Sequence, residues 1–188
     1  MISSIMTTNI DSYLEIILGG MYAGKTSRLV EIYKQCMFCN IPVIVINHQI
    51  DNRYDDEMLS THDKIKIPCV KTNKLMDLGG VYQWDVILVN EGQFFPDLYE
   101  FVDYVLNMRA GKKIYVCGLD GDFERRKFGQ ILDLIPLCDK VTKLTSLCSI
   151  CKDGTPGIFS KRISGETEQT VVGFDNYIPV CRRCYENN

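Results

Sequence analysis

The segment GGMYAGKT, residues 19–26, fits the pattern GxxxxGK[ST] at each fixed position. The apolar, β-branched run Tyr13–Leu18 before it predicts a strand. After it, apolar residues at helical spacing predict a helix from about Lys25. A glycine turn beside a surface lysine is the alternative, but the flanking strand and helix favour a phosphate-binding loop. The chain is therefore predicted to bind a nucleoside triphosphate.

The residue types of this loop suit phosphate binding. Glycines let backbone N–H groups curl around phosphate oxygens, and the start of the helix adds positive potential. Lys25 is expected to reach the β- and γ-phosphates, and the Thr26 hydroxyl is expected to ligate Mg²⁺. Every residue of the loop is predicted to contribute to ATP binding: Gly19, Gly20, Met21, Tyr22, Ala23, Gly24, Lys25 and Thr26.

Further strands and helices are predicted to alternate along the chain. Strands are predicted at 43–47, 85–90 and 112–119, and a helix is predicted from Pro96. Residues 48–66 are polar, carry no clear period and predict a mobile loop. This alternation favours an α/β fold, a P-loop kinase core with a parallel central sheet.

From about residue 143 the sequence changes to turns, glycines and cysteines. Two CxxC pairs stand roughly thirty residues apart, and four thiolates match a closed structural zinc site better than reduced pairs in turns. We therefore predict a nucleotide-binding α/β domain over residues 1–142 and a small zinc-ribbon subdomain over 143–188. The predicted Zn²⁺ ligands are Cys148, Cys151, Cys181 and Cys184.

A third CxxC pair, Cys36 and Cys39, lies at the end of the helix after the phosphate loop. Cysteine is small and apolar enough to be buried readily, so this pair is interpreted as core or half-buried thiols. The single cysteines Cys69, Cys117 and Cys138 lie in apolar settings and are interpreted in the same way.

Charge and hydropathy exclude some function classes. The net charge of −3 argues against non-specific adhesion to nucleic acid, which needs a basic surface. The apolar runs are too short to span a bilayer, and the N-terminal residues lack the pattern of a signal peptide. The sequence therefore predicts a cytoplasmic protein with neither nucleic acid nor membrane as a partner.

The stretch VILVNEGQFF, residues 86–95, predicts a buried strand that ends at Asn90 and Glu91. An α/β sheet opens its ligand crevice at this end of its strands, and acids there hold metals or accept protons. Phe94 is interpreted as a ring that stacks on a flat base, and Phe95 as a core residue. His48 and His62, in or beside the polar loop, are interpreted as solvated.

Together these motifs resemble those of the type II (cellular-type) thymidine kinases. The matching segments are, in chain order, GGMYAGKT, DNRYDDEMLSTHD, NEGQFF, GLDGDFERRKF and SKR…GET…Y…CRRCY. These segments span nearly the whole chain. The chain resembles the short members of the family, among which viral members are expected. The resemblance implies phosphorylation of the 5′-hydroxyl of thymidine or deoxyuridine by ATP–Mg²⁺. It also implies a homotetramer and feedback inhibition by dTTP.

The resemblance also implies roles for single residues. Glu91 corresponds to the general base, and residues 169–177 to the lasso, a loop that closes over the base and that the zinc is expected to anchor. The further ATP-binding residues implied are Asp51, Asn52, Arg53, Asn90, Gly92 and Gln93. The implied nucleoside-binding residues are Met21, Phe94, Leu119, Phe123, Phe128, Gln169, Thr170, Val171, Val172, Gly173 and Tyr177.

Three features of the sequence depart from the family pattern. Asn90 stands in place of an acid, Asp122 in place of a threonine, and the lasso is one residue shorter. An amide keeps an oxygen that can accept a hydrogen bond but brings no charge. Asn90 is therefore expected to weaken Mg²⁺ binding modestly, with Asp120 or Asp51 offsetting the lost charge.

Two other functions are open to a chain with these motifs. A P-loop switch or ATPase would use water as the nucleophile and would need no nucleoside pocket. A zinc-ribbon adaptor for nucleic acid would need a basic surface, which the acidic balance disfavours.

Overall fold

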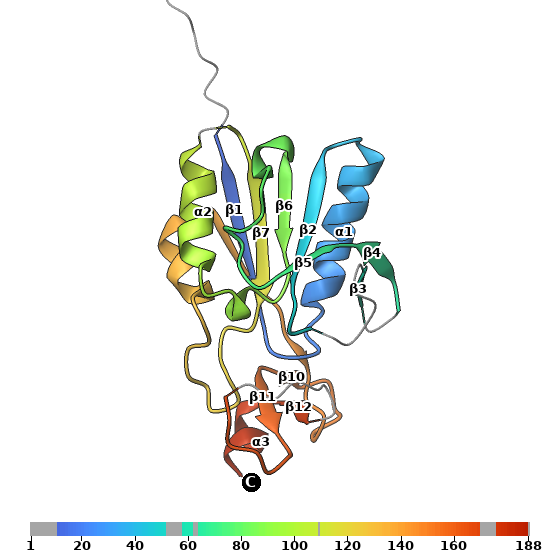
Figure 1. Ribbon diagram of the computed structural model, residues 1–188. Coiled ribbons are helices and arrows are strands. Elements are labelled where there is room, and N and C mark those ends of the chain that lie inside the picture. The colour runs from blue at the N-terminus through green and yellow to red at the C-terminus, as the bar shows by residue number, and fades with distance from the viewer. Residues whose placement is uncertain (1–10, 52–57, 62–63, 109, 170–175, 188) are drawn as a thin grey trace, which may run out of the picture.

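The computed structural model describes residues 11–51, 58–61, 64–108, 110–169 and 176–187. Within these residues the chain forms a six-stranded parallel sheet, with a small subdomain beneath it in Figure 1. The spatial order of the strands is β5-β2-β6-β7-β1-β8. Their bounds are Tyr13–Leu18 (β1), Val43–His48 (β2), Val70–Thr72 (β5), Val86–Val89 (β6), Lys113–Gly118 (β7) and Lys140–Lys143 (β8). The predicted α/β fold with a parallel central sheet is confirmed.

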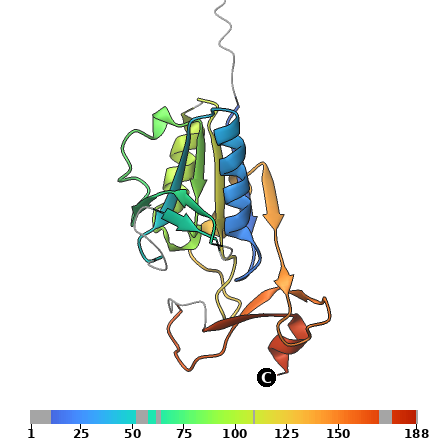
Figure 2. The ribbon, with the colours of Figure 1, turned by 90° about the vertical axis from the view of Figure 1, so that its right-hand side faces the viewer.

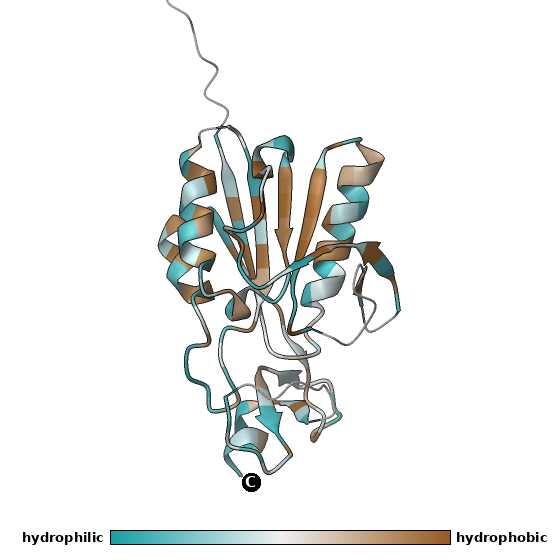
Figure 3. Cartoon of the chain, viewed as in Figure 1, coloured by the Kyte–Doolittle hydropathy of each residue, from teal (hydrophilic) through white to brown (hydrophobic). Residues whose placement is uncertain are grey.

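Successive side chains of a central strand face opposite sides of the sheet. In β1, Ile16 belongs to the apolar cluster that contains α2 (Leu98–Asn107), and Ile17 to the cluster that contains α1 (Lys25–Phe38). Figure 2 shows these helices on opposite faces, and Figure 3 shows apolar residues concentrated in the strands between them. Because both faces are covered, the strands appear in the sequence as nearly continuous apolar runs.

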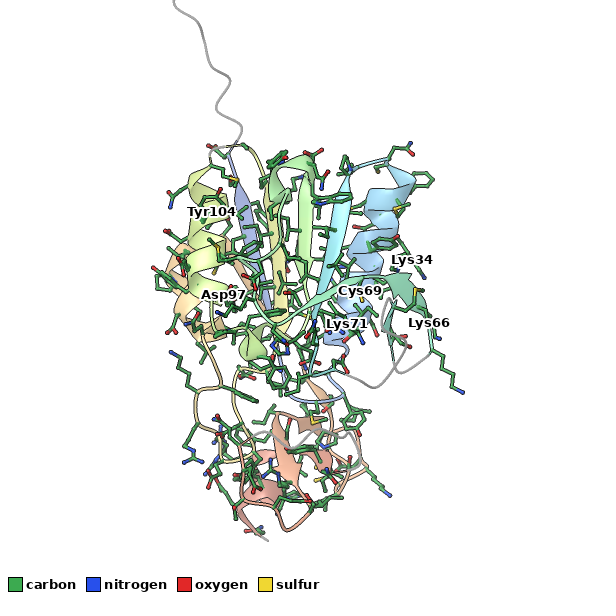
Figure 4. All side chains as sticks on the ribbon, in the orientation of Figure 1. Lys34, Lys66, Cys69, Lys71, Asp97 and Tyr104 are labelled. Atoms are coloured by element: carbon green, nitrogen blue, oxygen red, sulfur yellow. The ribbon has the colours of Figure 1, made fainter. Side chains whose placement is uncertain are left out.

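The predicted helices are present, with one displaced start. The helix predicted from Pro96 begins at Leu98. Asp97, labelled in Figure 4, accepts hydrogen bonds from the backbone N–H groups of Leu75 and Met76, at 3.1 and 2.9 Å. Its carboxylate thus joins α2 to the segment after β5. No helix in the described ranges is long and apolar enough to cross a membrane.

The prediction of a loop throughout residues 48–66 is wrong in part, because one short strand lies within this segment and another begins at Lys66. β3 (Met58–Ser60) and β4 (Lys66–Pro68) form an antiparallel hairpin. Leu59 and Ile67 are opposite each other in this hairpin and are buried in the α1 cluster. Strands of three residues are too short to show a clear period in the sequence.

The segment after β8 forms the C-terminal subdomain, whose described residues comprise two hairpins and a short helix. β9 (Ser146–Leu147) pairs with β10 (Pro156–Gly157), β11 (Phe159–Arg162) pairs with β12 (Tyr177–Val180), and α3 (Arg182–Glu186) follows. The division into domains 1–142 and 143–188 stays a prediction, although β8, the last strand of the large sheet, ends at Lys143.

The cysteines outside the two CxxC pairs of the predicted zinc site differ in exposure. Cys36 and Cys117 are buried, and Cys69 and Cys138 are half-buried, as expected. Cys39 is exposed, so the prediction of a buried or half-buried thiol is wrong there. Cys39 follows the last residue of α1, where the chain leaves the cluster that buries Cys36.

Candidate functional site

The predicted phosphate-binding loop, residues 19–26, connects β1 to α1. Gly24 stands just before the helix with φ 84°, a left-handed conformation that glycine adopts without steric cost. The ammonium group of Lys25 is buried and donates to the carbonyl of Gly20 at 2.8 Å, so it lies back across the loop. The backbone N–H of Met21 donates to Ser160 Oγ at 2.8 Å, which places β11 of the subdomain against this loop.

The chain turns sharply after β6, at Glu91. This residue has φ 54°, which is uncommon for a residue with a side chain and is typical of functional sites that hold backbone strain. The next turn is a 3-10 helix, η2 (Gly92–Phe94). Gln93 Nε2 donates to Glu91 Oε2 at 2.6 Å, and Gln93 Oε1 accepts from the N–H of Leu119 at 3.0 Å. Gln93 thereby fixes the carboxylate of Glu91 against the end of β7.

The close approach of Gln93 requires a glycine at the end of β7. A Cβ atom at Gly118 would lie 2.3 Å from Gln93 Oε1, far inside any normal contact. Any larger residue would therefore displace the side chain that holds Glu91.

Asn90 lies between the phosphate loop and the neighbouring strand β2. Its Oδ1 accepts from the Thr26 hydroxyl at 3.5 Å, and its Nδ2 donates to Asn47 Oδ1 at 2.9 Å. Asn47 Nδ2 in turn donates to Asp51 Oδ2 at 3.1 Å. Asp51 is thus connected to the predicted metal position through two amides, whereas Asp120 forms an ion pair with Lys143 at 2.7 Å. This arrangement favours Asp51 over Asp120 as the source of compensating charge.

The buried thiol of Cys117 also contacts Asn90. Its Sγ lies 3.1 Å from Asn90 Oδ1. Burial, and to a smaller extent the charge of Glu91, raises the pKa of Cys117 to about 12. The thiol is therefore neutral near pH 7 and can donate its proton to the amide oxygen.

Aromatic rings line the other side of this strand end. Phe94 packs edge-to-face on Phe128 with ring centroids 5.5 Å apart, and His48 packs on Phe94 and Phe95 at 5.8 and 4.9 Å. Phe95 is buried, as predicted. The prediction of a solvated His48 is wrong, because the ring is half-buried among these aromatics, and burial lowers its pKa.

The turn after β7 is tied to the subdomain through Asp122. Asp122 Oδ1 accepts from the backbone N–H groups of Glu124 and Arg126, at 2.9 and 2.8 Å. Its Oδ2 accepts from Gln169 Nε2 at 2.8 Å, at the start of the predicted lasso. The departure from threonine at this position therefore provides a carboxylate that joins the turn to the lasso.

Arg162, to which the sequence analysis assigned no role, holds the described part of the lasso segment. Its guanidinium lies over the ring of Phe123, 3.7 Å from the centroid, and donates to the hydroxyl of Tyr177. It also donates to the carbonyls of Glu166, Glu168 and Gln169. The sequence offered only the basic pair of the SKR segment as a signal, and basic pairs are common on surfaces.

The four predicted zinc ligands lie together between β9, β12 and α3. Their Sγ atoms all lie within 4.8 Å of one another, with Cys151 at 3.7 Å from Cys181 and 3.4 Å from Cys184. Tetrahedral Zn²⁺ with Zn–S bonds of about 2.3 Å would hold its sulfur atoms about 3.8 Å apart. The cluster therefore fits a closed Cys₄ metal site.

The surroundings of this cluster shift the pKa values of its thiols. Hydrogen bonding from the backbone, chiefly at Cys151, lowers the pKa of Cys148 to about 6. Hydrogen bonding to Cys151, together with burial, raises the pKa of Cys184 to about 12. Four adjacent thiols cannot all ionise without a cation between them, and a divalent metal would remove that conflict.

The predicted site residues that the structure describes lie at one end of the sheet and in the subdomain that faces this end. The phosphate loop, Glu91, Gln93 and Asp51 lie at the carboxyl ends of the parallel strands, where α/β proteins bind ligands. Six predicted site residues lie outside the described residues: Asn52, Arg53, Thr170, Val171, Val172 and Gly173.

A family model and several curated relatives of this chain carry the description thymidine kinase. The family model for thymidine kinase matches residues 12–185. The thymidine kinase of Yaba monkey tumor virus is 42% identical over 175 residues, which cover 92% of this chain and 94% of that protein. The thymidine kinase of Variola virus is 39% identical over 176 residues, covering 92% of this chain and 96% of that protein. The thymidine kinase of Myxoma virus is 39% identical over 175 residues, covering 92% of this chain and 95% of that protein.

Among solved structures, domain III of the Thermotoga maritima replication initiation protein DnaA matches 70% of this chain and 54% of that chain. The TM-score is 0.42 at 19% identity, a likeness too partial to bear on function. The family model and the viral relatives, in contrast, cover nearly the whole chain. The chain therefore belongs to the thymidine kinase family and is a phosphotransferase.

Proposed function

We propose that the chain transfers the γ-phosphoryl group of ATP to the 5′-hydroxyl of thymidine, and also of deoxyuridine. The observation that carries this proposal is the position of Glu91. Glu91 follows Asn90, which contacts Thr26 of the predicted phosphate loop, and its carboxylate is fixed by a 2.6 Å hydrogen bond from Gln93. The relatives named thymidine kinase support thymidine as the acceptor.

In this proposal Glu91 is the general base. It accepts the proton of the 5′-hydroxyl as that oxygen attacks phosphorus, and the bond between the γ-phosphorus and its bridging oxygen breaks. Glu91 stands in a left-handed turn after β6, and its carboxylate accepts a hydrogen bond from Gln93. Lys25 and the backbone N–H groups of the loop hold the phosphates.

The oxygen atoms of Thr26 and Asn90 fit Mg²⁺, which prefers oxygen ligands and retains several waters. When bound, Mg²⁺ would supply positive charge that neutralises the charge developing on the phosphate oxygens. Thr26 would hold the ion directly, and Asn90 Oδ1 would accept a hydrogen bond from one of its waters.

The nucleoside would occupy the space between the aromatic cluster and the lasso. Phe94 and Phe128 offer apolar ring surface to the base, and Phe123, in the turn that Asp122 holds, packs against Arg162 of the subdomain. Backbone groups of the lasso would recognise the 4-oxo group and N3–H of thymine. A site built for these groups rejects cytosine because its own polar atoms would then stay unpaired.

A structural zinc ion at the Cys₄ cluster would anchor both ends of the lasso without taking part in the reaction. Cys148 and Cys151 precede β11, and Cys181 follows β12, so the metal would close the hairpin from which the lasso extends. The family resemblance further supports a homotetramer and dTTP as a feedback inhibitor.

A panel of nucleosides with ATP–Mg²⁺ tests this proposal. Thymidine and deoxyuridine should be phosphorylated, and deoxycytidine and purine nucleosides should be poor acceptors. Equal turnover of deoxycytidine would contradict the assignment. Rapid ATP hydrolysis that thymidine does not change would favour the ATPase alternative.

Glu91→Gln tests the general base. Turnover should fall by roughly a hundredfold or more, because an amide cannot accept the proton, while ATP and thymidine still bind. Glu100→Gln, an exposed acid on α2, is the matched control and should leave the rate unchanged. A fully active Glu91→Gln enzyme would disprove the catalytic assignment.

A further inference from the structure

Four polar side chains form a line of hydrogen bonds beneath the phosphate loop. The line runs from Thr26 through Asn90 and Asn47 to Asp51. The last three are almost fully buried, with exposed fractions of 1% for Asn90, 2% for Asn47 and 8% for Asp51. Buried polar groups are costly unless paired, so these bonds constrain one another.

The carboxylate at one end gives this line a direction. An ionised carboxylate can only accept hydrogen bonds, whereas an amide has a donor end and an acceptor end. Asn47 must therefore turn its Nδ2 to Asp51 and its Oδ1 to Asn90. Asn90 must in turn donate from its own Nδ2, which leaves its Oδ1 on the side of Thr26.

A second contact is consistent with this direction. The thiol of Cys117 lies 3.1 Å from the same Oδ1 of Asn90 and can donate to it. A thiol is a weak donor and also a weak acceptor, so it cannot fix the amide alone. The ammonium group of Lys71, a residue labelled in Figure 4, donates to the backbone carbonyl of Asp51 at 3.1 Å, which places a cation beside this acid.

We propose that Asn47 and Asp51 are positioning residues that set the polarity of Asn90, so that this amide presents oxygen rather than N–H₂ to the cation site at Thr26. Asp51 acts through Asn47 and does not need to touch the metal. This inference rests on the proposed use of Mg²⁺. It explains how a chain with an amide at the strand end can still serve a cation: the carboxylate lies two side chains away and determines which end of the amide faces Thr26.

Exchange of Asp51 for asparagine removes the fixed acceptor. Asn47 can then rotate, and Asn90 can turn its N–H₂ group toward Thr26. The metal-bound water would lose its acceptor and meet a donor. A lost hydrogen bond of this kind corresponds to a rise of about tenfold in the metal concentration needed for half-saturation.

The decisive experiment repeats this exchange in the Asn90→Asp background. A carboxylate at position 90 offers oxygen whichever way it turns, so its orientation no longer depends on Asn47. Mn²⁺ binding in the presence of a non-hydrolysable ATP analogue, followed by electron paramagnetic resonance, gives a readout that is independent of turnover. Asp51→Asn should raise the half-saturating Mn²⁺ about tenfold in the native background and less than about twofold in the Asn90→Asp background.

Other outcomes overturn the proposal. Equal effects of Asp51→Asn in the two backgrounds would mean that Asp51 acts on the metal directly, by its charge or as a ligand. If Asn90→Asp itself left Mn²⁺ binding unchanged, Asn90 would not face the metal, and both this inference and that part of the proposed function would fail. If Asp51→Asn weakened Mn²⁺ binding only in the native background but the protein did not phosphorylate thymidine, the proposed function alone would be contradicted.

Asn47→Leu provides a second route if Asp51→Asn does not fold. Leucine has a similar size and breaks the line without removing the carboxylate. The expected pattern is the same: Asn47→Leu should weaken Mn²⁺ binding in the native background and leave it nearly unchanged in the Asn90→Asp background. Asn73→Leu, at an exposed amide that bonds Gln49 Oε1 at 2.7 Å, is the matched control and should show no effect in either background. Thermal melts by circular dichroism identify folded variants.

Discussion

In the central sheet, apolar side chains from β1 and β6 fill the space between the strands and the helices on both faces. In the C-terminal subdomain, the buried apolar cluster consists of Val180 and three cysteines, with a few half-buried neighbours. The described residues of the subdomain are therefore held together largely by the four predicted metal ligands. We expect a small unit with so little apolar burial to depend on the proposed zinc for its folding free energy, whereas the sheet should not.

The two regions also contribute differently to the proposed reaction. The sheet supplies the phosphate loop, Glu91 and the polar line to Asp51, all at strand ends that the core holds rigidly. The subdomain supplies Arg162 and the start of the lasso, which would contact the nucleoside. Binding of ATP and binding of thymidine should therefore respond separately to changes in the two regions.

Cys181→Ser should produce the largest separation. Loss of one ligand from a closed Cys₄ site should release the metal and unfold the subdomain, because the binding free energy of a structural zinc is also folding free energy. Thymidine affinity should fall by about a hundredfold or more, while affinity for an ATP analogue changes by less than about threefold. Native mass spectrometry for zinc, together with calorimetric titration of each ligand, measures both effects.

Cys39→Ser is the control for this prediction, because Cys39 is exposed and belongs to the CxxC pair outside the cluster. It should retain zinc and both affinities. An equal loss of ATP binding in Cys181→Ser would show that the regions are not separable. The hydrogen bond from Met21 N–H to Ser160 Oγ would be the contact that joins them.

Arg162→Lys should produce a smaller effect of the same kind. Lysine keeps the charge but loses the planar fork that donates to the carbonyls of Glu166, Glu168 and Gln169, at and just before the start of the lasso, and that stacks on Phe123. The KM for thymidine should rise about tenfold with little change in the KM for ATP. Steady-state kinetics with each substrate varied in turn distinguishes the two constants.

The matched control is Arg28→Lys on α1, whose surface pair with Glu31 should contribute little. If Arg162→Lys lowered turnover with both KM values unchanged, Arg162 would act on the chemical step instead of on the lasso.

Glu15→Gln should have the smallest effect and concerns the stability of the sheet. Glu15 is buried in β1 and accepts from Thr142 at 2.6 Å and Tyr13 at 3.1 Å, with Lys140 at 3.1 Å. It thereby connects edge strand β8 to β1. The free energy of unfolding should fall by about 1–3 kcal/mol, the range for a disturbed buried hydrogen-bonding group. Urea unfolding of the two proteins measures it.

The pH dependence of this effect has a definite sign. Burial alone would raise the pKa of Glu15, but hydrogen bonds from Thr142, Lys140 and Tyr13 outweigh it and lower the pKa below its ordinary value. A lowered pKa gives stability that is present above the ordinary value and is lost as pH falls through the folded-state value. The difference between native protein and Glu15→Gln should therefore shrink in acid. A constant difference down to low pH would contradict this account.

The sequence alone was sufficient for features that depend on neighbouring residues. The spacing of GGMYAGKT between a strand and a helix predicted the phosphate loop, and two CxxC pairs predicted the Cys₄ cluster. Glycine, lysine and cysteine at fixed offsets encode such features locally, because the backbone turn and the ligand spacing are set within a few residues. The continuous apolar runs likewise predicted strands covered on both faces.

Only the tertiary structure decided which distant residues meet. The pairing of Asn47 with Asn90 follows from the parallel register of β2 and β6. The packing of Arg162 on Phe123 follows from the position of the subdomain beside the turn after β7. Neither contact leaves a local pattern, because polar side chains and basic pairs occur widely on surfaces. Local periodicity records which face of an element is buried, whereas the order and register of strands depend on the free energy of packing the whole sheet.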